Sequence, residues 1–209
     1  MIKLYRNGAS PNSKRVMICA AELGLELDIH DLDFGKGANR EDAYLKLTPM
    51  GKVPTLDEDG WPLWESAAIA WYLAESNPSK GLLPADIKGR SDQMRWMFWN
   101  ACHLESAVTG LLHERTIKPL LGQTGDEKLI EEHLKGVHRF LPVLNAHLEG
   151  RPWMGKQFSL ADVCLGVTVE LCPALQVDLA PYPHAAAWLG RLQRRPSWVA
   201  SSAVEASEA

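Results

Sequence analysis

The chain has 209 residues, of which 46% are hydrophobic and 23% charged, and its formal net charge is −4. This composition is ordinary for a globular protein with one large or two small domains, and the slight negative charge excludes the basic surface of a nucleic-acid-binding protein. No stretch has the ~18 uncharged apolar residues of a membrane span, and no secretory signal precedes the first predicted strand. We therefore expect a cytoplasmic protein that binds neither nucleic acid nor membranes.

The four cysteines are scattered through segments with helical patterns: Cys19, Cys102, Cys164 and Cys172. No pair has the CxxC spacing of a zinc or redox site, so we expect no metal. Buried, reduced thiols are the simplest interpretation, and they agree with a cytoplasmic location.

Short strands and helices alternate in the first part of the chain. Residues 2–6 form an apolar run typical of a strand, and residues 11–23 have a helical pattern that ends at Gly24. Residues 25–30 alternate apolar and polar side chains, which is the period of a half-buried strand. This strand–helix–strand unit is long enough for a right-handed parallel crossover.

A β-hairpin is predicted next, because the short runs 53–56 and 61–64 flank a turn that contains glycine. A short helix over 40–47 precedes the hairpin. A third helix, over 67–76, follows it and can be capped by Ser66.

The patterns in the second half of the chain are almost wholly helical, over residues 90–115, 126–148, 160–172 and 183–195. The helix that begins at residue 160 is the most apolar and should be central to its domain. Ser159 and Asp162 have the spacing of a capping box at its start.

The composition therefore divides the chain in two. We expect an α/β domain over 1–77, a proline- and glycine-rich linker over 78–90, and an all-helical domain over 91–209. The residues after Trp198 are small and polar, so we expect the chain end to be frayed.

The turn between the first strand and the first helix has the sequence SPNSKRV, residues 10–16. Ser10 is a preferred N-cap residue, and Pro11 suits the first helical position. A hydroxyl here lies among free N–H groups at the positive end of the helix, where an anion such as a thiolate can be held. The alternative is that Ser10 only caps the helix.

Pro54 interrupts the strand pattern of residues 53–56, although proline cannot donate to a β-ladder. The sequence alone favours a trans bond on an edge strand, because cis X–Pro bonds are uncommon. A cis bond would instead turn the Val53 backbone outward, where its N–H and C=O could pair with a peptide-like ligand.

Glu65 and Ser66 follow the hairpin and open the third helix. In one interpretation Ser66 caps the helix and Glu65 is merely exposed. In the other, the N–H and hydroxyl of Ser66 bind a carboxylate while Glu65 binds an ammonium, as the head of an α-amino acid requires. Lys52 could meet a second carboxylate. A ligand with an amino-acid head, a central peptide, a carboxylate tail and a thiol is glutathione.

Four motifs stand in the order and spacing of the cytosolic glutathione S-transferases: SPNSKRV (10–16), GKVPTL (51–56), WESAAIAWYL (64–73) and FSLADV (158–163). The chain resembles this family over nearly its whole length, and in particular its bacterial, serine-type members (theta-, phi- and nu-like). The resemblance implies a thioredoxin-like α/β domain followed by an all-helical domain, and a symmetric homodimer. It also implies a transferase with glutathione as co-substrate and no permanently bound cofactor.

The resemblance also implies how glutathione is bound. Val53 and Pro54 match the cis-proline pair whose backbone contacts the cysteinyl part, so a cis bond becomes the expectation. Glu65 and Ser66 match the pair at the γ-glutamyl group, and Lys52 matches a position near the glycyl carboxylate.

Ser10 matches the serine that donates a hydrogen bond to the glutathione sulfur, and Asn12 could point its amide at the same sulfur. Ser13 and Tyr5 are the alternative donors, since tyrosine-type members carry their catalytic residue on the first strand. A free thiol has a pKa near ~8.5, which a hydroxyl donor and a helix N-terminus lower. The thiolate, and not the serine, is then the nucleophile. Positions 10 and 13 hold no cysteine, so the nucleophile of cysteine-type members is missing.

The second substrate, a small hydrophobic electrophile or a peroxide, would lie between the Ser10 turn and the first long helix. On that helix the spacing of four residues allows them to share one face: Trp96, Trp99, Asn100 and His103. Alternatively, the tryptophans belong to the core and the histidine is an ordinary helix residue.

Two other kinds of function stay open. The chain could be a non-catalytic glutathione- or ligand-binding protein of the same fold. It could also be a specialised glutathione-dependent isomerase, dehalogenase or disulfide reductase, although the turn lacks the Ser-Ser-Cys sequence expected of a zeta-type isomerase. Nothing in the sequence identifies the electrophile.

Overall fold

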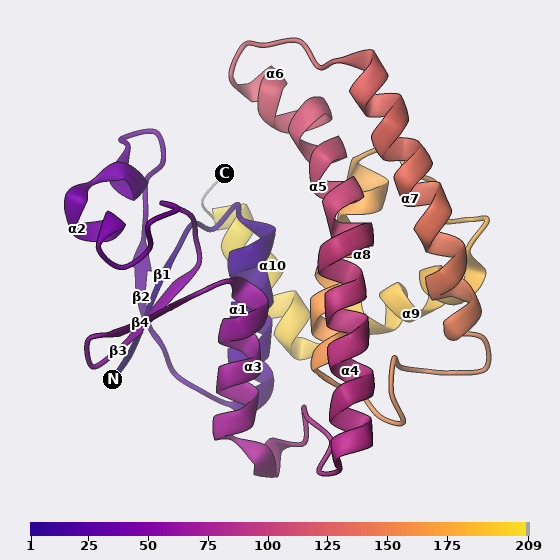
Figure 1. Ribbon diagram of the computed structural model, residues 1–209, viewed down its shortest axis with the longest axis horizontal. Coiled ribbons are helices and arrows are strands. Elements are labelled where there is room, and N and C mark those ends of the chain that lie inside the picture. Colours follow the sequence, from indigo (N-terminus) through magenta and orange to yellow (C-terminus); the bar gives the residue numbers. More distant parts are fainter. Residues whose placement is uncertain (208–209) are drawn as a thin grey trace. The chain divides into compact units, whose positions relative to one another are not determined.

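The computed structural model describes residues 1–207, which form two compact units (Figure 1). The first unit comprises Met1–Leu83 together with the segment from Arg195 onward, and the second comprises Pro84–Arg194. The first unit is mixed α/β and the second is helical, which confirms the expected fold class. The segment from Arg195 onward, which the sequence analysis placed in the helical domain, groups with the first unit.

The first unit contains a four-stranded sheet with the order β2-β1-β3-β4. The central strand β1 pairs in parallel with β2 and antiparallel with β3, so Leu4 lies opposite both Ile29 and Leu56. The parallel pair is the crossover that the sequence predicts. The strands are β1 (Ile2–Arg6), β2 (Asp28–Asp31), β3 (Thr55–Glu58) and β4 (Trp61–Trp64).

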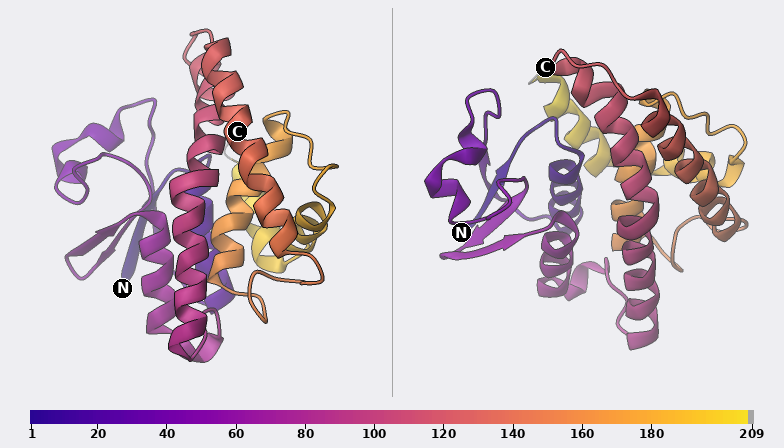
Figure 2. Two further views of the ribbon diagram at one scale, coloured as in Figure 1. Left: turned by 45° about the vertical axis from the view of Figure 1, so that its right-hand side comes forward. Right: turned by 45° about the horizontal axis from the view of Figure 1, so that its top comes forward.

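Helices α1 (Pro11–Leu23) and α3 (Ser66–Ser76) cover one face of this sheet, and α2 (Asp42–Leu45) lies on the other (Figures 1 and 2). The core between them is apolar: Leu4, Ile18, Leu56 and Ile69 are fully buried. Helix α1 ends as predicted, because Gly24 adopts the left-handed conformation (φ 68°) that closes a helix. Two short 3₁₀ turns complete the unit, at Ala38–Arg40 and Pro78–Lys80.

Helix α10 (Pro196–Ser207) packs along α1 within the first unit. The Glu22 carboxylate of α1 accepts hydrogen bonds from Arg195 Nε and Nη2, both at 2.7 Å, and from Ser197 Oγ at 2.5 Å. Burial alone would raise the pKa of Glu22, but the bonds from Arg195 and Ser197 outweigh it and hold the pKa below its usual value. Trp198 is buried, and the residues after it, for which a frayed end is expected, continue the helix through Ser207.

The second unit is built from helices, which are α4 (Ile87–Trp99), α5 (Glu105–Leu112), α6 (Lys118–Leu120), α7 (Glu127–His147), α8 (Leu160–Ala174) and α9 (Pro183–Gln193). Two π-helical turns, Asn100–Leu104 and His113–Ile117, interrupt the helix predicted over 90–115. Most of α8 is buried, as its apolar sequence indicates. Within the described residues, we find no helix with the length and apolarity needed to cross a membrane.

The start of α8 is fixed by a buried carboxylate at Asp162. It accepts hydrogen bonds from Ser159 N (3.0 Å), Ser159 Oγ (2.8 Å), Met154 N (2.8 Å) and Trp188 Nε1 (2.8 Å). The capping box predicted from the spacing of Ser159 and Asp162 is therefore present. Through Met154 and Trp188, the Asp162 carboxylate also connects the loop before α8 to helix α9.

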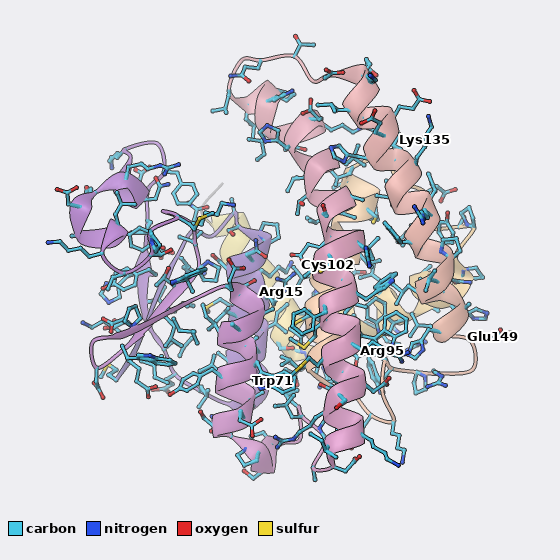
Figure 3. The ribbon with its side chains drawn as sticks, viewed as in Figure 1. Arg15, Trp71, Arg95, Cys102, Lys135 and Glu149 are labelled. Carbon is cyan, nitrogen blue, oxygen red and sulfur yellow. The ribbon has the colours of Figure 1, made fainter. Side chains whose placement is uncertain are left out.

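The cysteines are only partly as expected. Cys19, Cys164 and Cys172 are buried free thiols, and burial raises the pKa of Cys172 to about 12. Cys102 is exposed on the first π-helical turn (Figure 3), which corrects the prediction that all four are buried.

Candidate functional site

A cavity of about 110 Å³ opens in the first unit, beside the loop that leads into β3 and the start of α3. It gathers Asn12 from α1 with all five residues predicted to bind glutathione. Its lining comprises Asn12, Thr48, Met50, Lys52, Val53, Pro54, Trp64, Glu65 and Ser66. Residues separated by more than fifty positions in sequence thus meet in one concave site.

The Val53–Pro54 peptide bond is cis, as the family resemblance implies and the sequence alone does not. Strand β3 begins at Thr55, so Pro54 lies just before the strand, where its missing N–H interrupts no ladder bond. The preceding loop is held by the Tyr44 hydroxyl, which donates to the carbonyl oxygen of Lys52 at 2.6 Å. Burial raises the pKa of Tyr44, so this hydroxyl keeps its proton and stays a donor. Lys52 itself is exposed at the cavity.

Glu65 has a backbone conformation that side chains rarely adopt, with φ 72° and ψ 108°. Helix α3 begins at Ser66, so Glu65 occupies the N-cap position and the prediction that Ser66 caps the helix is wrong. The N–H of Ser66 is consequently one of the unpaired donors at the positive end of α3. A non-glycine residue with positive φ costs about 1–3 kcal/mol and is found preferentially at binding sites. The exposed Glu65 carboxylate and the Ser66 N–H thus border the same cavity.

Three side chains, two of which line the cavity, form a closed hydrogen-bond network. Arg15 Nη1 lies 3.0 Å from Asn12 Oδ1 and 2.6 Å from Ser66 Oγ, and Ser66 Oγ lies 3.2 Å from Asn12 Oδ1. Arg15 is buried on α1 and does not line the cavity, whereas Asn12 and Ser66 do. The network therefore links the N-terminal turn of α1 to the first residue of α3.

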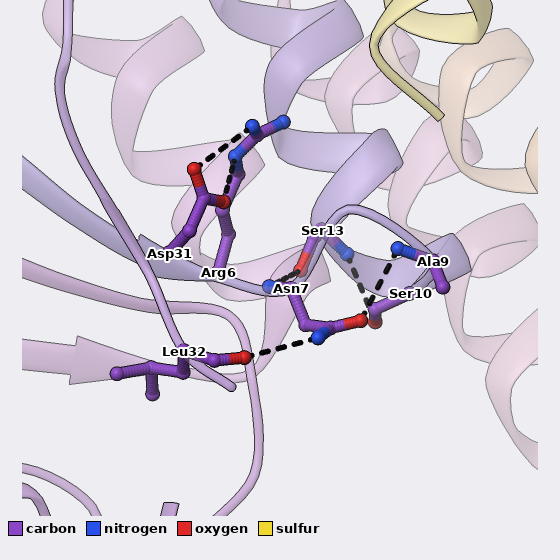
Figure 4. Close-up of polar contacts among 7 residues, drawn as sticks. All are labelled: Arg6, Asn7, Ala9, Ser10, Ser13, Asp31 and Leu32. Atoms are coloured by element: carbon purple, nitrogen blue, oxygen red, sulfur yellow. Dashed lines mark hydrogen bonds and ion pairs between the residues drawn. The ribbon is translucent and has the colours of Figure 1, made fainter. Parts of the chain in front are cut away.

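Ser10 caps α1, as one of the two interpretations of the sequence requires. Its Oγ accepts a hydrogen bond from Ser13 N at 3.4 Å (Figure 4). An accepting hydroxyl retains its own proton, so this bond leaves the Ser10 O–H available as a donor. Ser10 is half-buried and is not among the residues that line the 110 Å³ cavity.

The two alternatives to Ser10 already make internal contacts. Ser13 is buried, and its Oγ accepts a hydrogen bond from Asn7 N at 3.3 Å (Figure 4). The ring of Tyr5 packs against His30 and Tyr44, at centroid distances of 5.0 and 5.7 Å. Both residues thus contribute to the packing of the first unit.

The residues predicted for the second substrate all lie in the helical unit, where Trp96 and Asn100 are buried, Trp99 is half-buried and His103 is exposed. Trp96 contacts Trp99 and, at a ring-centroid distance of 4.4 Å, His147 of α7. Trp99 and His103 both pack on Phe140 of the same helix, at ring-centroid distances of 6.0 Å and 5.3 Å, respectively. The contacts of buried Trp96 are those expected of a core residue, whereas His103 packs on Phe140 from an exposed position.

Asn100, the fourth of these residues, is buried, and its Nδ2 donates to Thr168 Oγ1 of α8 at 3.1 Å and to Glu105 Oε2 at 2.8 Å. In the part of the chain that the structure describes, no group of three or more His, Cys, Asp or Glu side chains could hold a metal ion.

Four residues of the site were not predicted from the sequence: Arg15, Thr48, Met50 and Trp64. Trp64 adjoins Glu65, and Thr48 precedes the Pro49 turn, so their positions beside predicted residues were the available signal. Arg15 follows Asn12 by three positions on a helix, a spacing that brings side chains together.

Comparison with known proteins gives the same family along most of the chain. The model for the glutathione S-transferase N-terminal domain matches residues 9–76, and that for the C-terminal domain matches residues 127–191. The protein named "Probable glutathione S-transferase GSTF2" of Oryza sativa subsp. japonica is 34% identical over 205 residues, which is 94% of this chain and 93% of the relative. Glutathione S-transferase 3 of Zea mays is 31% identical, over 94% of this chain and 91% of that protein.

Two further relatives bear on ligand and reaction. The disulfide-bond oxidoreductase YfcG of Escherichia coli (strain K12) is 30% identical over 215 residues, covering 94% of this chain and 92% of that protein. The solved structure of glutathione S-transferase-I bound with the ligand lactoylglutathione has a TM-score of 0.88 and 29% identity, covering 97% of this chain and 99% of that one.

Proposed function

Since this chain belongs to the glutathione S-transferase family, we propose that the 110 Å³ cavity binds glutathione and that Ser10 stabilises the thiolate of the bound ligand. The observation that carries the proposal is the convergence of five predicted contact residues on one cavity. The same cavity adjoins the α1 turn through Asn12.

Each part of glutathione has a chemically matched group in the cavity. The backbone N–H and C=O of Val53 pair with the cysteinyl part, as an added strand would. The Glu65 carboxylate binds the α-ammonium, and the Ser66 N–H at the start of α3 binds the α-carboxylate. The exposed ammonium of Lys52 binds the glycyl carboxylate at the other end.

Thiolate formation is the task of the α1 turn. The O–H of Ser10 donates to the glutathione sulfur, with the Asn12 amide as a second donor. Both lie at the N-terminal end of α1, whose positive end also favours an anion. The thiolate then attacks a small hydrophobic electrophile, its carbon–sulfur bond forming as the leaving group departs. Ser13 is disfavoured because it is almost fully buried, whereas Ser10 is half-buried, and the ring of Tyr5 is packed against His30 and Tyr44.

A second reaction, the reduction of disulfides, is favoured by the 30% identity to YfcG, a disulfide-bond oxidoreductase. Here the bound thiolate attacks a disulfide and releases one thiolate, and a second glutathione then releases the other as glutathione disulfide forms. Neither Ser10 nor Ser13 can form a mixed disulfide, so all of the redox chemistry would belong to glutathione.

Glutathione titration tests the proposal. We expect binding at micromolar to millimolar affinity, and a ligand that binds only the native state stabilises it by roughly 2.7 kcal/mol at a hundred times Kd. If ~10 mM glutathione produces neither a rise in Tm nor a calorimetric heat, the proposal is wrong. A panel of conjugation, peroxidase and disulfide-reduction assays then separates the two reactions from a non-catalytic binding role.

We also propose a symmetric homodimer in the cytoplasm, as the family resemblance implies. Two-fold dimers are the commonest closed assemblies. The four free cysteines fit a reducing compartment.

A further inference from the structure

The buried guanidinium of Arg15 lies one contact away from the glutathione cavity. It comes from α1 (Figure 3), and only 3% of the residue is exposed. Its Nη1 contacts two residues that line the cavity, Asn12 at 3.0 Å and Ser66 at 2.6 Å. Because Arg15 does not itself line the cavity, it can influence a bound ligand through these two neighbours.

The donor chemistry of Arg15 fixes the orientation of Asn12. A guanidinium only donates hydrogen bonds, so the Asn12 atom that lies 3.0 Å from it is the amide oxygen. The same oxygen is 3.2 Å from Ser66 Oγ. With Oδ1 committed to these two contacts, the NH₂ group of Asn12 is left for other acceptors.

The same logic fixes the hydroxyl proton of Ser66. Its Oγ accepts a bond from Arg15 Nη1, so its own O–H is free to donate and points to Asn12 Oδ1. A carboxylate of a bound ligand would meet the backbone N–H of Ser66 in this arrangement, because the hydroxyl proton is already used.

We propose that Arg15 is a positioning residue of this site. It presents the Asn12 NH₂ to the glutathione sulfur, and it keeps the Ser66 hydroxyl donating its hydrogen bond to Asn12 Oδ1. The inference rests on the proposed function and deepens it by assigning separate tasks to the two amide atoms of Asn12. Oδ1 holds the network together, and Nδ2 acts on the ligand.

Two substitutions of Asn12 separate these tasks. In Asn12→Asp the carboxylate can still accept from Arg15 and Ser66, so we expect the Tm of the wild type. In Asn12→Leu both donors lose their partner, so we expect a lower Tm. Both variants lack the N–H donor, so both should form the bound thiolate only at higher pH, by about one pH unit. The ultraviolet absorbance of the thiolate, followed against pH, reports this shift without turnover.

Substitutions of Arg15 test whether it acts through Asn12. We expect Arg15→Met to raise the pH of thiolate formation as much as Asn12→Leu does, and to lower kcat about tenfold with a smaller change in KM. The double variant should show no further shift, because the two residues act as one unit. Arg15→Lys keeps the charge and one donor, and should recover part of the loss.

Three results would overturn the proposal. One is a wild-type pH profile in Arg15→Met below its melting temperature, which would leave Arg15 a purely structural role. Another is full additivity of Arg15→Met and Asn12→Leu. The third, which needs no folded Arg15 variant, is an Asn12→Asp protein that melts as low as Asn12→Leu. The first two results presuppose that the wild type binds glutathione, and failure of that binding refutes the proposed function instead.

Discussion

The strained backbone of Glu65 gives a prediction in which stability and binding change in opposite directions. With φ 72°, the backbone conformation of this residue lowers the free energy of unfolding by about 1–3 kcal/mol, a cost that glycine would avoid. A glycine in turn lowers the free energy of unfolding by roughly 0.4–1 kcal/mol, because it gives the unfolded chain more conformational freedom. The difference predicts that Glu65→Gly is more stable than Glu65→Ala by about 1 kcal/mol, which is roughly 2–4 °C in Tm for a chain of this size.

Glutathione binding should fall in both variants, because both lack the carboxylate that contacts the α-ammonium. A hydrogen bond to a charged group contributes about 1.5–3 kcal/mol, so Kd should rise about ten- to a hundredfold. Thermal unfolding of the two variants measures Tm, and calorimetric titration measures the Kd for glutathione. The Kd of Glu65→Gln, which keeps a neutral acceptor, should lie between those of the two variants and that of the wild type. Equal Tm values for Glu65→Gly and Glu65→Ala would refute the strain argument. Wild-type affinity for glutathione in Glu65→Gly would refute the contact between Glu65 and the α-ammonium.

Further predictions concern the thiolate, the α1–α10 contact, the helical unit and the assembly. Ser10→Ala should lower turnover about ten- to a hundredfold and move the pH profile upward, while glutathione affinity changes less; Tyr5→Phe should do neither. Because its bonds hold the pKa of Glu22 below 4.5, Glu22 stabilises the fold above that pH and loses this effect as pH falls through its folded pKa. Acid unfolding followed by circular dichroism should therefore be less steep in Glu22→Gln. Asp162→Ala leaves buried donors unpaired, at roughly 1–3 kcal/mol each, and should lower Tm more than any surface substitution. Light scattering should give twice the 23.2 kDa chain mass.

The following results would contradict these predictions. If Tyr5→Phe abolishes conjugation while Ser10→Ala keeps the rate and the pH profile, the donor is the tyrosine. Ser10→Ala also removes a helix cap, at about 1 kcal/mol, so rates must be compared well below both melting temperatures. An acid-unfolding curve of Glu22→Gln that matches the wild type would show that the contact adds no pH-dependent stability. A mass near 23.2 kDa would exclude the dimer.

Local patterns were sufficient to predict most elements of the first unit. The helix from Pro11 to Leu23 has a proline start and a Gly24 stop, and the structure has the same bounds. The Ser159 and Asp162 spacing predicted the start of α8 for the same reason, since capping depends on neighbours in sequence.

Contacts between distant segments were harder to predict. The tail after Trp198 has little apolar character of its own, and its helix is held by the bonds between Arg195 and Glu22. The interruption of α4 by a π-helical turn at Asn100 likewise has no signal in a periodic apolar pattern.

At the candidate site, the sequence predicted the residues that face a ligand better than those that hold them in place. Lys52, Val53 and Glu65 belong to recognisable motifs, and all three line the cavity. The Arg15 network could not be predicted, because its bond to Ser66 spans 51 positions and depends on how α1 packs against α3.

A crystal structure of the protein with glutathione tests the central claim most directly. The account predicts the cysteinyl backbone paired with Val53, the α-ammonium at Glu65, and the sulfur within hydrogen-bond distance of Ser10 Oγ. Glutathione bound away from the cavity beside Val53, or with its sulfur on Tyr5 or Ser13, would contradict it.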